Sequence, residues 1–135
     1  MARGLDNRNP GNIRQSKARY RGEVRPSRDP AFKEFESLAW GYRAIFVLLD
    51  TYRIRYGLDT LRGMISRWAP PSENHTDAYI RAVAADTGLD SDERLDTHDA
   101  RTMIPVAAAI SRVENGTPAD MRQVAEGWRL FRGDS

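Results

Sequence analysis

One long segment, LAWGYRAIFVLLDTYRIRY at residues 38–56, constrains the fold of this chain more than any other. Ser37 before it is a favourable N-cap and Gly57 after it is a favourable C-terminal stop, so the sequence predicts one helix between them. The middle of the segment is apolar nearly all round, which is typical of a helix buried on every side. We therefore expect the other elements to pack around this central helix.

Two shorter helices are expected next along the chain. Thr60 is placed to cap the segment LRGMISRW, and the prolines that follow Ala69 end that helix because they remove a donor and crowd the preceding turn. Thr76 opens the segment TDAYIRAVAADT, and Gly88 supplies its stop.

Two more helices are expected near the C-terminus. The first runs over about 100–115 and carries Pro105 either near its first turn or at a kink. The second opens with TPAD, where Thr117 is the expected cap, Pro118 takes the first helical position and Asp120 completes the capping pair.

Residues 4–36 show no helical period and are rich in turn-forming residues, so they predict loops with a short β-hairpin. The chain is therefore expected to form an α-dominated α+β fold of about five helices with a small N-terminal hairpin. Its 135 residues suit a single domain over 1–135, with a basic loop and hairpin part at 1–36 and a helical part at 37–132.

The positive charge gathers at the N-terminal end. Residues 1–28 hold eight Arg or Lys against two acids, a net charge of +6, whereas the remainder has −4. Such a segment favours an anionic partner, nucleic acid or an acidic cell-envelope polymer, and the alternative is an extended, solvated arm. The chain has no cysteine, its two histidines lack metal-ligand spacing, and we expect neither a metal site nor a cofactor.

No apolar stretch of signal-peptide type follows MARGLDNRNP, and the longest aliphatic-aromatic run, AIFVLL, is far too short to span a bilayer. We expect neither an export signal nor membrane insertion.

Glu114 stands out in the expected helix over 100–115. With 3.6 residues per turn it falls only about 40° from Ile110, inside the apolar stripe, and it lies in the last turn. Burial and the negative end of the helix dipole both disfavour the charged carboxylate. A carboxylic acid held partly protonated is what protonation of a glycosidic oxygen requires. The alternative is an ordinary helix-end residue that bends outward or pairs with Arg112.

The chain contains the motif RWAPPSEN-x-T-x-x-Y-I, together with RNPGNIR, F-x-x-F-x-S, GYRA, YRIRYG and SRVENG. These motifs resemble those of a family of phage and prophage proteins that includes virion structural proteins and lysozyme-like lysins. The resemblance covers about residues 4–131, and RWAPPSEN-x-T-x-x-Y-I is its most specific stretch.

A second resemblance links the chain to lytic transglycosylases and related glucosaminidases, which carry their acid at a helix end. VENG is similar to their acid motif, NPGNIR with FKEFES to their hairpin, and ENHTDAYI to a later helix. The motifs occur in a different order, so the resemblance implies a circularly permuted lysozyme-like fold with the Glu114 helix beside the N-terminal hairpin. The short-spaced Glu, Asp and Thr of phage lysozymes are absent, which puts a nearby carboxylate nucleophile in doubt.

Under this hypothesis Glu114 is the general acid and base, and Glu36 is the first choice for a second carboxylate. Glu34 and Glu36 flank Phe35, so both are expected to face solvent or a cleft. The residues expected to bind substrate are Asn9, Asn12, Arg14, Trp68, Glu73 and Tyr79. The asparagines are equally suited to forming turns, Glu73 to bracing the helix that begins at Thr76, and most aromatic residues to the core.

Two functions remain open. The first is cleavage of peptidoglycan glycan strands by a phage or prophage lysin, as a lytic transglycosylase or muramidase. The second is a non-catalytic virion structural protein, or one associated with nucleic acid through the basic N-terminal segment. We expect a monomer located in a virion, or in the host cytoplasm with delivery to the cell wall or periplasm. Its partners would be peptidoglycan and other virion proteins, with nucleic acid only under the second function.

Overall fold

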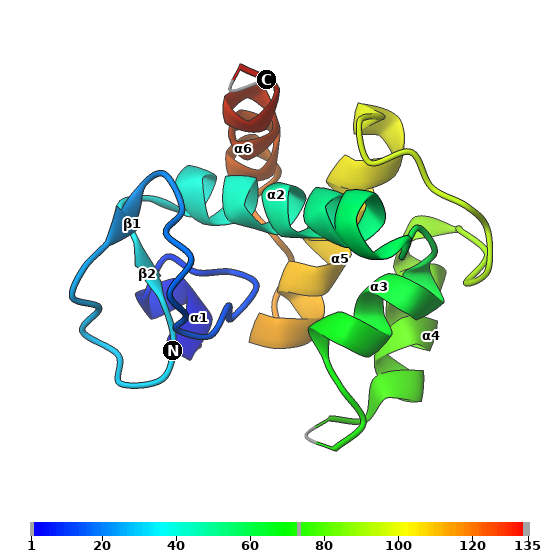
Figure 1. The fold of residues 1–135 in the computed structure, drawn as a ribbon, viewed down its shortest axis with the longest axis horizontal. Helices are drawn as coiled ribbons and strands as arrows, with labels where there is room; N and C mark the ends of the chain where they lie inside the picture. Colours follow the sequence, from blue (N-terminus) through cyan, green and yellow to red (C-terminus); the bar gives the residue numbers. More distant parts are fainter. Residues whose placement is uncertain (1, 73, 134–135) are drawn as a thin grey trace.

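Helix α2 (Leu38–Tyr56) crosses the middle of the molecule, and the other elements lie around it (Figure 1). The structure, a computed structural model, describes residues 2–72 and 74–133. The side chain of Ser37 accepts a hydrogen bond from the Trp40 N–H over 3.3 Å, and Gly57 ends the helix with φ of 67°. The sequence prediction of a capped, central helix is confirmed.

Helix-rich structure with a small antiparallel sheet confirms the α-dominated fold class. The elements besides α2 are α1 (Arg3–Asp6), β1 (Glu23–Val24), β2 (Glu34–Phe35), α3 (Leu61–Trp68), α4 (Thr76–Thr87), α5 (Ala100–Asn115) and α6 (Met121–Gly133). The four-residue α1 was not expected, and Pro105 lies in the second turn of α5 without interrupting it. No helix within the described ranges is long and apolar enough to cross a membrane.

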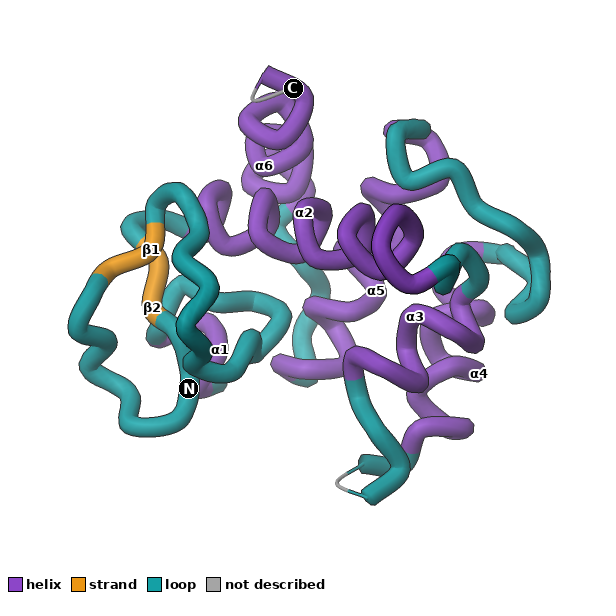
Figure 2. Tube along the Cα trace, in the orientation of Figure 1, coloured by secondary structure: helices purple, strands orange, loops and turns teal. Residues whose placement is uncertain are grey.

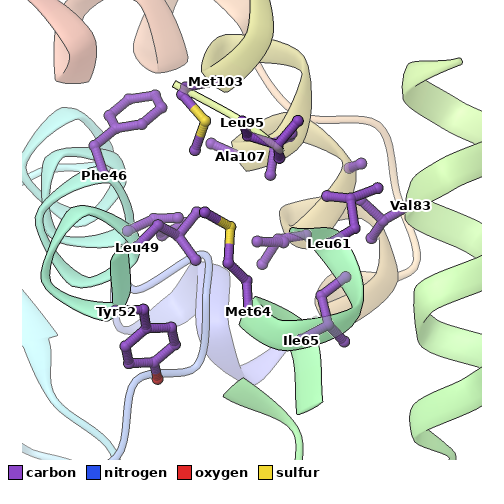
Figure 3. Packing of buried hydrophobic residues seen from close by; sticks show 14 of the residues in the cluster. Phe46, Leu49, Tyr52, Leu61, Met64, Ile65, Val83, Leu95, Met103 and Ala107 are labelled. Carbon is purple, nitrogen blue, oxygen red and sulfur yellow. The ribbon is translucent and has the colours of Figure 1, made fainter. Parts of the chain in front are cut away.

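The hydrophobic core lies between α2 and the three helices α3, α4 and α5 (Figure 3). Leu49 of α2, Met64 of α3, Val83 of α4 and Met103 of α5 are all buried there. Helix α6 also packs against α2 and contributes Phe131 to the same cluster. Burial of α2 from several directions explains why its sequence is apolar nearly all round.

The last helix begins later than expected. Its first residue is Met121, and the side chain of Asp120 accepts a hydrogen bond from the Arg122 N–H over 3.1 Å. An aspartate is as good an N-cap as a threonine, so Asp120 replaces the expected cap at Thr117.

The basic N-terminal segment is folded against the helices and is not an extended arm. Two-residue strands β1 and β2 pair antiparallel, and loops make up most of residues 7–33 (Figure 2). Glu34 is 3% exposed and pairs with Arg8 over 3.2 Å and with Arg28 over 3.0 Å. The expectation that Glu34 faces solvent or a cleft is wrong, because the N-terminal segment covers that face of so short a strand.

Asp29 ties the start of the chain to the hairpin loop. Arg3 donates to both of its carboxylate oxygens, over 2.5 and 2.6 Å, and the Asn7 side chain donates to it over 3.0 Å. The hydrogen bond from Arg3, joined by the backbone N–H groups of Ala31 and Phe32, holds the pKa of Asp29 well below its usual range. Asp29 is therefore expected to stabilise the fold at neutral pH.

An Asp29→Asn variant should be less stable than wild type at pH 7, and the difference should narrow in acid. A carboxylate whose pKa is depressed on folding stabilises the protein above its unfolded pKa of about 4 and loses that effect as the pH falls further. Urea unfolding at pH 7 and pH 3 measures the difference. A gap between the two proteins that stays constant across this range would contradict the assignment.

Candidate functional site

Glu114 lies near the C-terminal end of α5, in the part of the helix between the N-terminal segment and helices α3 and α4 (Figure 1). The side chain of Asn12 donates to its Oε1 over 2.9 Å, and the hydroxyl of Tyr79 donates to its Oε2 over 2.8 Å. Arg112 binds Asp86 of α4 instead of Glu114. The half-buried carboxyl thus joins two parts of the fold and does not behave as an ordinary helix-end residue.

The loop NPGN presents Asn12 to Glu114. Asn9 within it is fully buried, donates to the carbonyls of Ile13 and Lys33 over 2.9 Å each, and accepts from the Ile13 N–H over 3.0 Å. Asn12 has φ of 49°, a left-handed conformation that asparagine tolerates better than most residues. Asn9 therefore shapes the loop, and its expected role in binding sugar is wrong because its amide is already fully engaged.

A close approach of α1 holds the same loop against the end of α5. The side chain of Asn115 donates to the carbonyl of Pro10 over 2.9 Å. A Cβ placed on Gly4 would lie 2.6 Å from the side-chain oxygens of both Asn12 and Asn115, so any side chain there would displace them. Gly4 is thus required for the position of the residue that binds Glu114.

A groove of about 430 Å³ opens beside Glu114, a volume within the usual range for ligand sites. Its walls come from the N-terminal segment, from α2 and from the end of α3 with the turn that follows. The lining residues are Gly11, Asn12, Ile13, Arg14, Ser16, Tyr20, Phe32, Leu48, Tyr52, Arg67, Trp68, Ala69, Pro70, Asn74 and Glu114. The groove combines aromatic side chains with polar groups.

A second hollow of about 320 Å³ lies beside α4. Glu114 and Asn74 line both hollows, and the second one is completed by His75, Ala78, Tyr79, Ala82 and Val113. Glu114 therefore borders both hollows, although it is held by Asn12 and Tyr79.

Tyr79 is 7% exposed, so its ring does not offer the stacking face that the sequence suggested. Burial, followed by the charge and the hydrogen bond of Glu114, raises the pKa of Tyr79 far above its usual value. Trp68 is a further hydrogen-bond partner of the Tyr79 hydroxyl. Tyr79 thus remains a neutral donor at any physiological pH and fixes the position of the Glu114 carboxyl.

The structure brings Glu114, Asn12, Arg14 and Trp68 together in one groove, and their roles in binding and catalysis stay predictions. Glu36 is exposed and is not among the described residues that line either hollow. Glu73, the remaining candidate, lies outside the described residues. The proposed protonation of Glu114 stays a prediction.

Sequence reasoning missed Arg67 and Asn74, which both line the groove. Arg67 lies in a predicted amphipathic helix, where an arginine is expected to face solvent. Asn74 lies in a proline-rich turn, where an asparagine is an ordinary turn residue. Both belong to the stretch RWAPPSEN, which carries the most specific family resemblance, and that stretch was the available signal.

In residues 2–72 and 74–133, no three His, Asp or Glu side chains gather in a way that would hold a metal ion. That the function needs no metal or cofactor stays a prediction.

Comparison with known proteins places the chain among phage-associated proteins. No protein-family model matches it. Over 131 residues it is 38% identical to Protein P5 of Pseudoalteromonas phage PM2, and the alignment covers 94% of this chain and 80% of that protein. The chain therefore belongs to the family of Protein P5. This result confirms the expected phage association and leaves the activity to be proposed.

Proposed function

We propose that this protein cleaves the glycan strands of peptidoglycan, with Glu114 as the general acid and base. The observation that supports this most directly is the position of Glu114, at the meeting point of two hollows and fixed by Asn12 and Tyr79. A general acid must be held within hydrogen-bond reach of the atom that it protonates. A polymeric substrate lying in the groove would bring a glycosidic oxygen to this carboxyl.

Each oxygen of Glu114 accepts one hydrogen bond, from Asn12 or from Tyr79, and keeps a further lone pair that can take up a proton. In the first step the protonated carboxyl gives its proton to the glycosidic oxygen as the C1–O bond breaks. In the second step the carboxylate takes the proton of the C6 hydroxyl of N-acetylmuramic acid as O6 bonds to C1. The product is a 1,6-anhydro sugar, the outcome of a lytic transglycosylase.

The second step is favoured over attack by a carboxylate because Glu114 is the one acid among the described residues that line the groove. A retaining glycosidase needs two carboxyl groups about 5 Å apart. Glu36, the residue first considered for that role, lies outside the groove lining.

The test is release of soluble glycan fragments from purified peptidoglycan by the wild-type protein. Mass spectrometry separates anhydro ends from reducing ends, because hydrolysis adds one water for each bond broken and a fragment with a reducing end is heavier than its anhydro counterpart by that water. We expect anhydro ends. Reducing ends would replace the transglycosylase mechanism with hydrolysis, and the absence of any released fragment would overturn the proposed function.

A Tyr79→Phe variant should cleave peptidoglycan about tenfold more slowly, the usual effect of a ~1.4 kcal/mol change. The ring still fills its buried site, but Glu114 loses the donor that positions it. We expect kcat to fall with KM nearly unchanged, since Tyr79 is not among the described residues that line the groove. An unchanged kcat would show that Asn12 alone positions the acid.

A second candidate is a non-catalytic virion structural protein, which the relation to a phage protein supports. Under this function the groove would be a docking surface for another virion protein. Mass spectrometry of purified virions of the phage that encodes the chain tests its presence. Virions that lack the protein would exclude this candidate. Virions that contain it, together with glycan cleavage by the purified protein, would show that it is a virion protein and an enzyme.

The nucleic-acid form of the second candidate is weakened by the structure. Of the eight basic residues in the segment 1–28, Arg3, Arg8, Arg25 and Arg28 form ion pairs with acids of the same region. Three acids, Asp29, Glu34 and Glu23, hold these four arginines, so part of their charge is neutralised within the fold and the segment is less suited to binding phosphate than its sequence suggested.

A further inference from the structure

Two arginines line the groove beside Glu114, one from each wall. Arg14 belongs to the N-terminal segment and Arg67 to the last turn of α3. Neither forms a salt bridge within the described part of the chain, in contrast to Arg62 and Arg94, which bind Asp92 and Asp59. The groove therefore presents two guanidinium groups that have no acidic partner among the described residues.

Aromatic rings hold both guanidinium groups in place. Arg14 lies over the ring of Phe32 with 5.1 Å between its guanidinium carbon and the ring centroid. Arg67 lies over Tyr56 at 3.9 Å and over Tyr52 at 5.4 Å. A stacked guanidinium keeps its N–H donors free at the ring edge, so it is preorganised to bind a ligand.

The described lining residues of the groove carry a net positive charge, because the two arginines outnumber the one acid, Glu114. A guanidinium matches the geometry of a carboxylate with two parallel hydrogen bonds. The groove thus favours a substrate that carries carboxylates close to the cleaved bond over a neutral glycan.

We propose that Arg14 and Arg67 determine specificity, by binding carboxylates on the substituents of the glycan strand. The inference rests on the proposed function, which supplies the glycan. In peptidoglycan such carboxylates are carried by the peptides attached to every second sugar, whereas a chitin-type glycan has none.

The experiment compares two forms of one polymer: peptidoglycan with its amines acetylated, and the same material with its carboxyl groups also converted to amides. Wild type should cleave the amidated form about tenfold more slowly, since charge-assisted hydrogen bonds are lost. The double variant Arg14→Gln/Arg67→Gln should cleave the acetylated form about tenfold more slowly and should no longer distinguish the two forms. Thermal melting checks that the variant is folded.

Lys17→Gln is the matched control for general attraction between charges. Lys17 is an exposed cation of the same loop and is not among the residues that line the groove. Its loss should leave the ratio of the two rates unchanged. Equal rates of wild type on both forms, or a ratio altered as much by Lys17→Gln as by the arginine variants, would overturn the proposal.

Co-sedimentation of the proteins with both polymers separates this inference from the proposed function. Wild type should sediment preferentially with the acetylated form, and the double arginine variant should show no preference. If wild type binds with this preference but cleaves neither form, the catalytic function fails while the specificity of the groove holds. If it cleaves but binds both forms equally, the inference fails and the function holds.

Discussion

A Glu114→Gln variant should release glycan fragments from peptidoglycan at least ~100-fold more slowly than wild type, the lower end of the effect of a general acid–base group. The amide keeps the shape of the side chain and can still accept one hydrogen bond from Asn12 or Tyr79. It can neither give a proton to the glycosidic oxygen nor take one from the C6 hydroxyl. The loss should therefore appear in kcat, while binding to peptidoglycan is retained.

Glu93→Gln is the matched control, because Glu93 is an exposed glutamate in the loop between α4 and α5. It should cleave peptidoglycan at the wild-type rate. Both variants are compared at equal concentration after thermal melting has shown that they are folded. A Glu114→Gln protein that matches Glu93→Gln in rate would end the assignment of Glu114 as the acid, whichever function the protein has.

The helices were predictable from the sequence because capping residues and glycines near their ends mark where most of them begin and end. Ser37 and Thr60 each cap the helix that the sequence assigned to them, and Gly57, Gly88 and Gly116 end helices with positive φ. The four-residue α1 was missed because so short a helix carries no periodic pattern. The start of α6 was misplaced because Thr117 and Asp120 are both good caps and only tertiary packing chooses between them.

The site was predictable only in part. The helical phase placed Glu114 on the core side of α5, and the resemblance to lytic transglycosylases suggested the neighbourhood of NPGN. Local sequence cannot show which residue a polar side chain binds when that residue is distant in the chain. Asn9 and Asn12 look alike in the sequence. The side chain of Asn9 donates only to backbone carbonyls, whereas that of Asn12 donates to Glu114. Arg67 was missed for the same reason, since its neighbours in the groove come from distant segments.

A Glu23→Gln variant should lose about 3–5 kcal/mol in the free energy of unfolding, the usual cost of breaking a buried ion pair. The side chains of Lys33 and Glu23 are 0% and 4% exposed, and Lys33 Nζ donates to both oxygens of Glu23 over 3.1 Å. Burial raises the pKa of Glu23, but hydrogen bonds from Arg25, the Tyr20 N–H and Lys33 outweigh it and hold the pKa below its ordinary value. The variant would therefore leave a buried ammonium group without its counter-charge. Urea unfolding at pH 7 measures the loss.

Lys33→Met should cost less than Glu23→Gln, because Glu23 keeps its pair with Arg25 at 2.8 Å. The double variant should be more stable than Glu23→Gln alone, since it removes the unpaired ammonium. Lys33 also donates to the carbonyls of Ser16 and Ala18, in the loop that forms one wall of the groove. Glu23→Gln should thus speed amide hydrogen exchange in residues 14–21 as well. A loss below about 1 kcal/mol, the scale of exposed pairs, would mean that water reaches the ammonium and that this pair does not hold the groove wall.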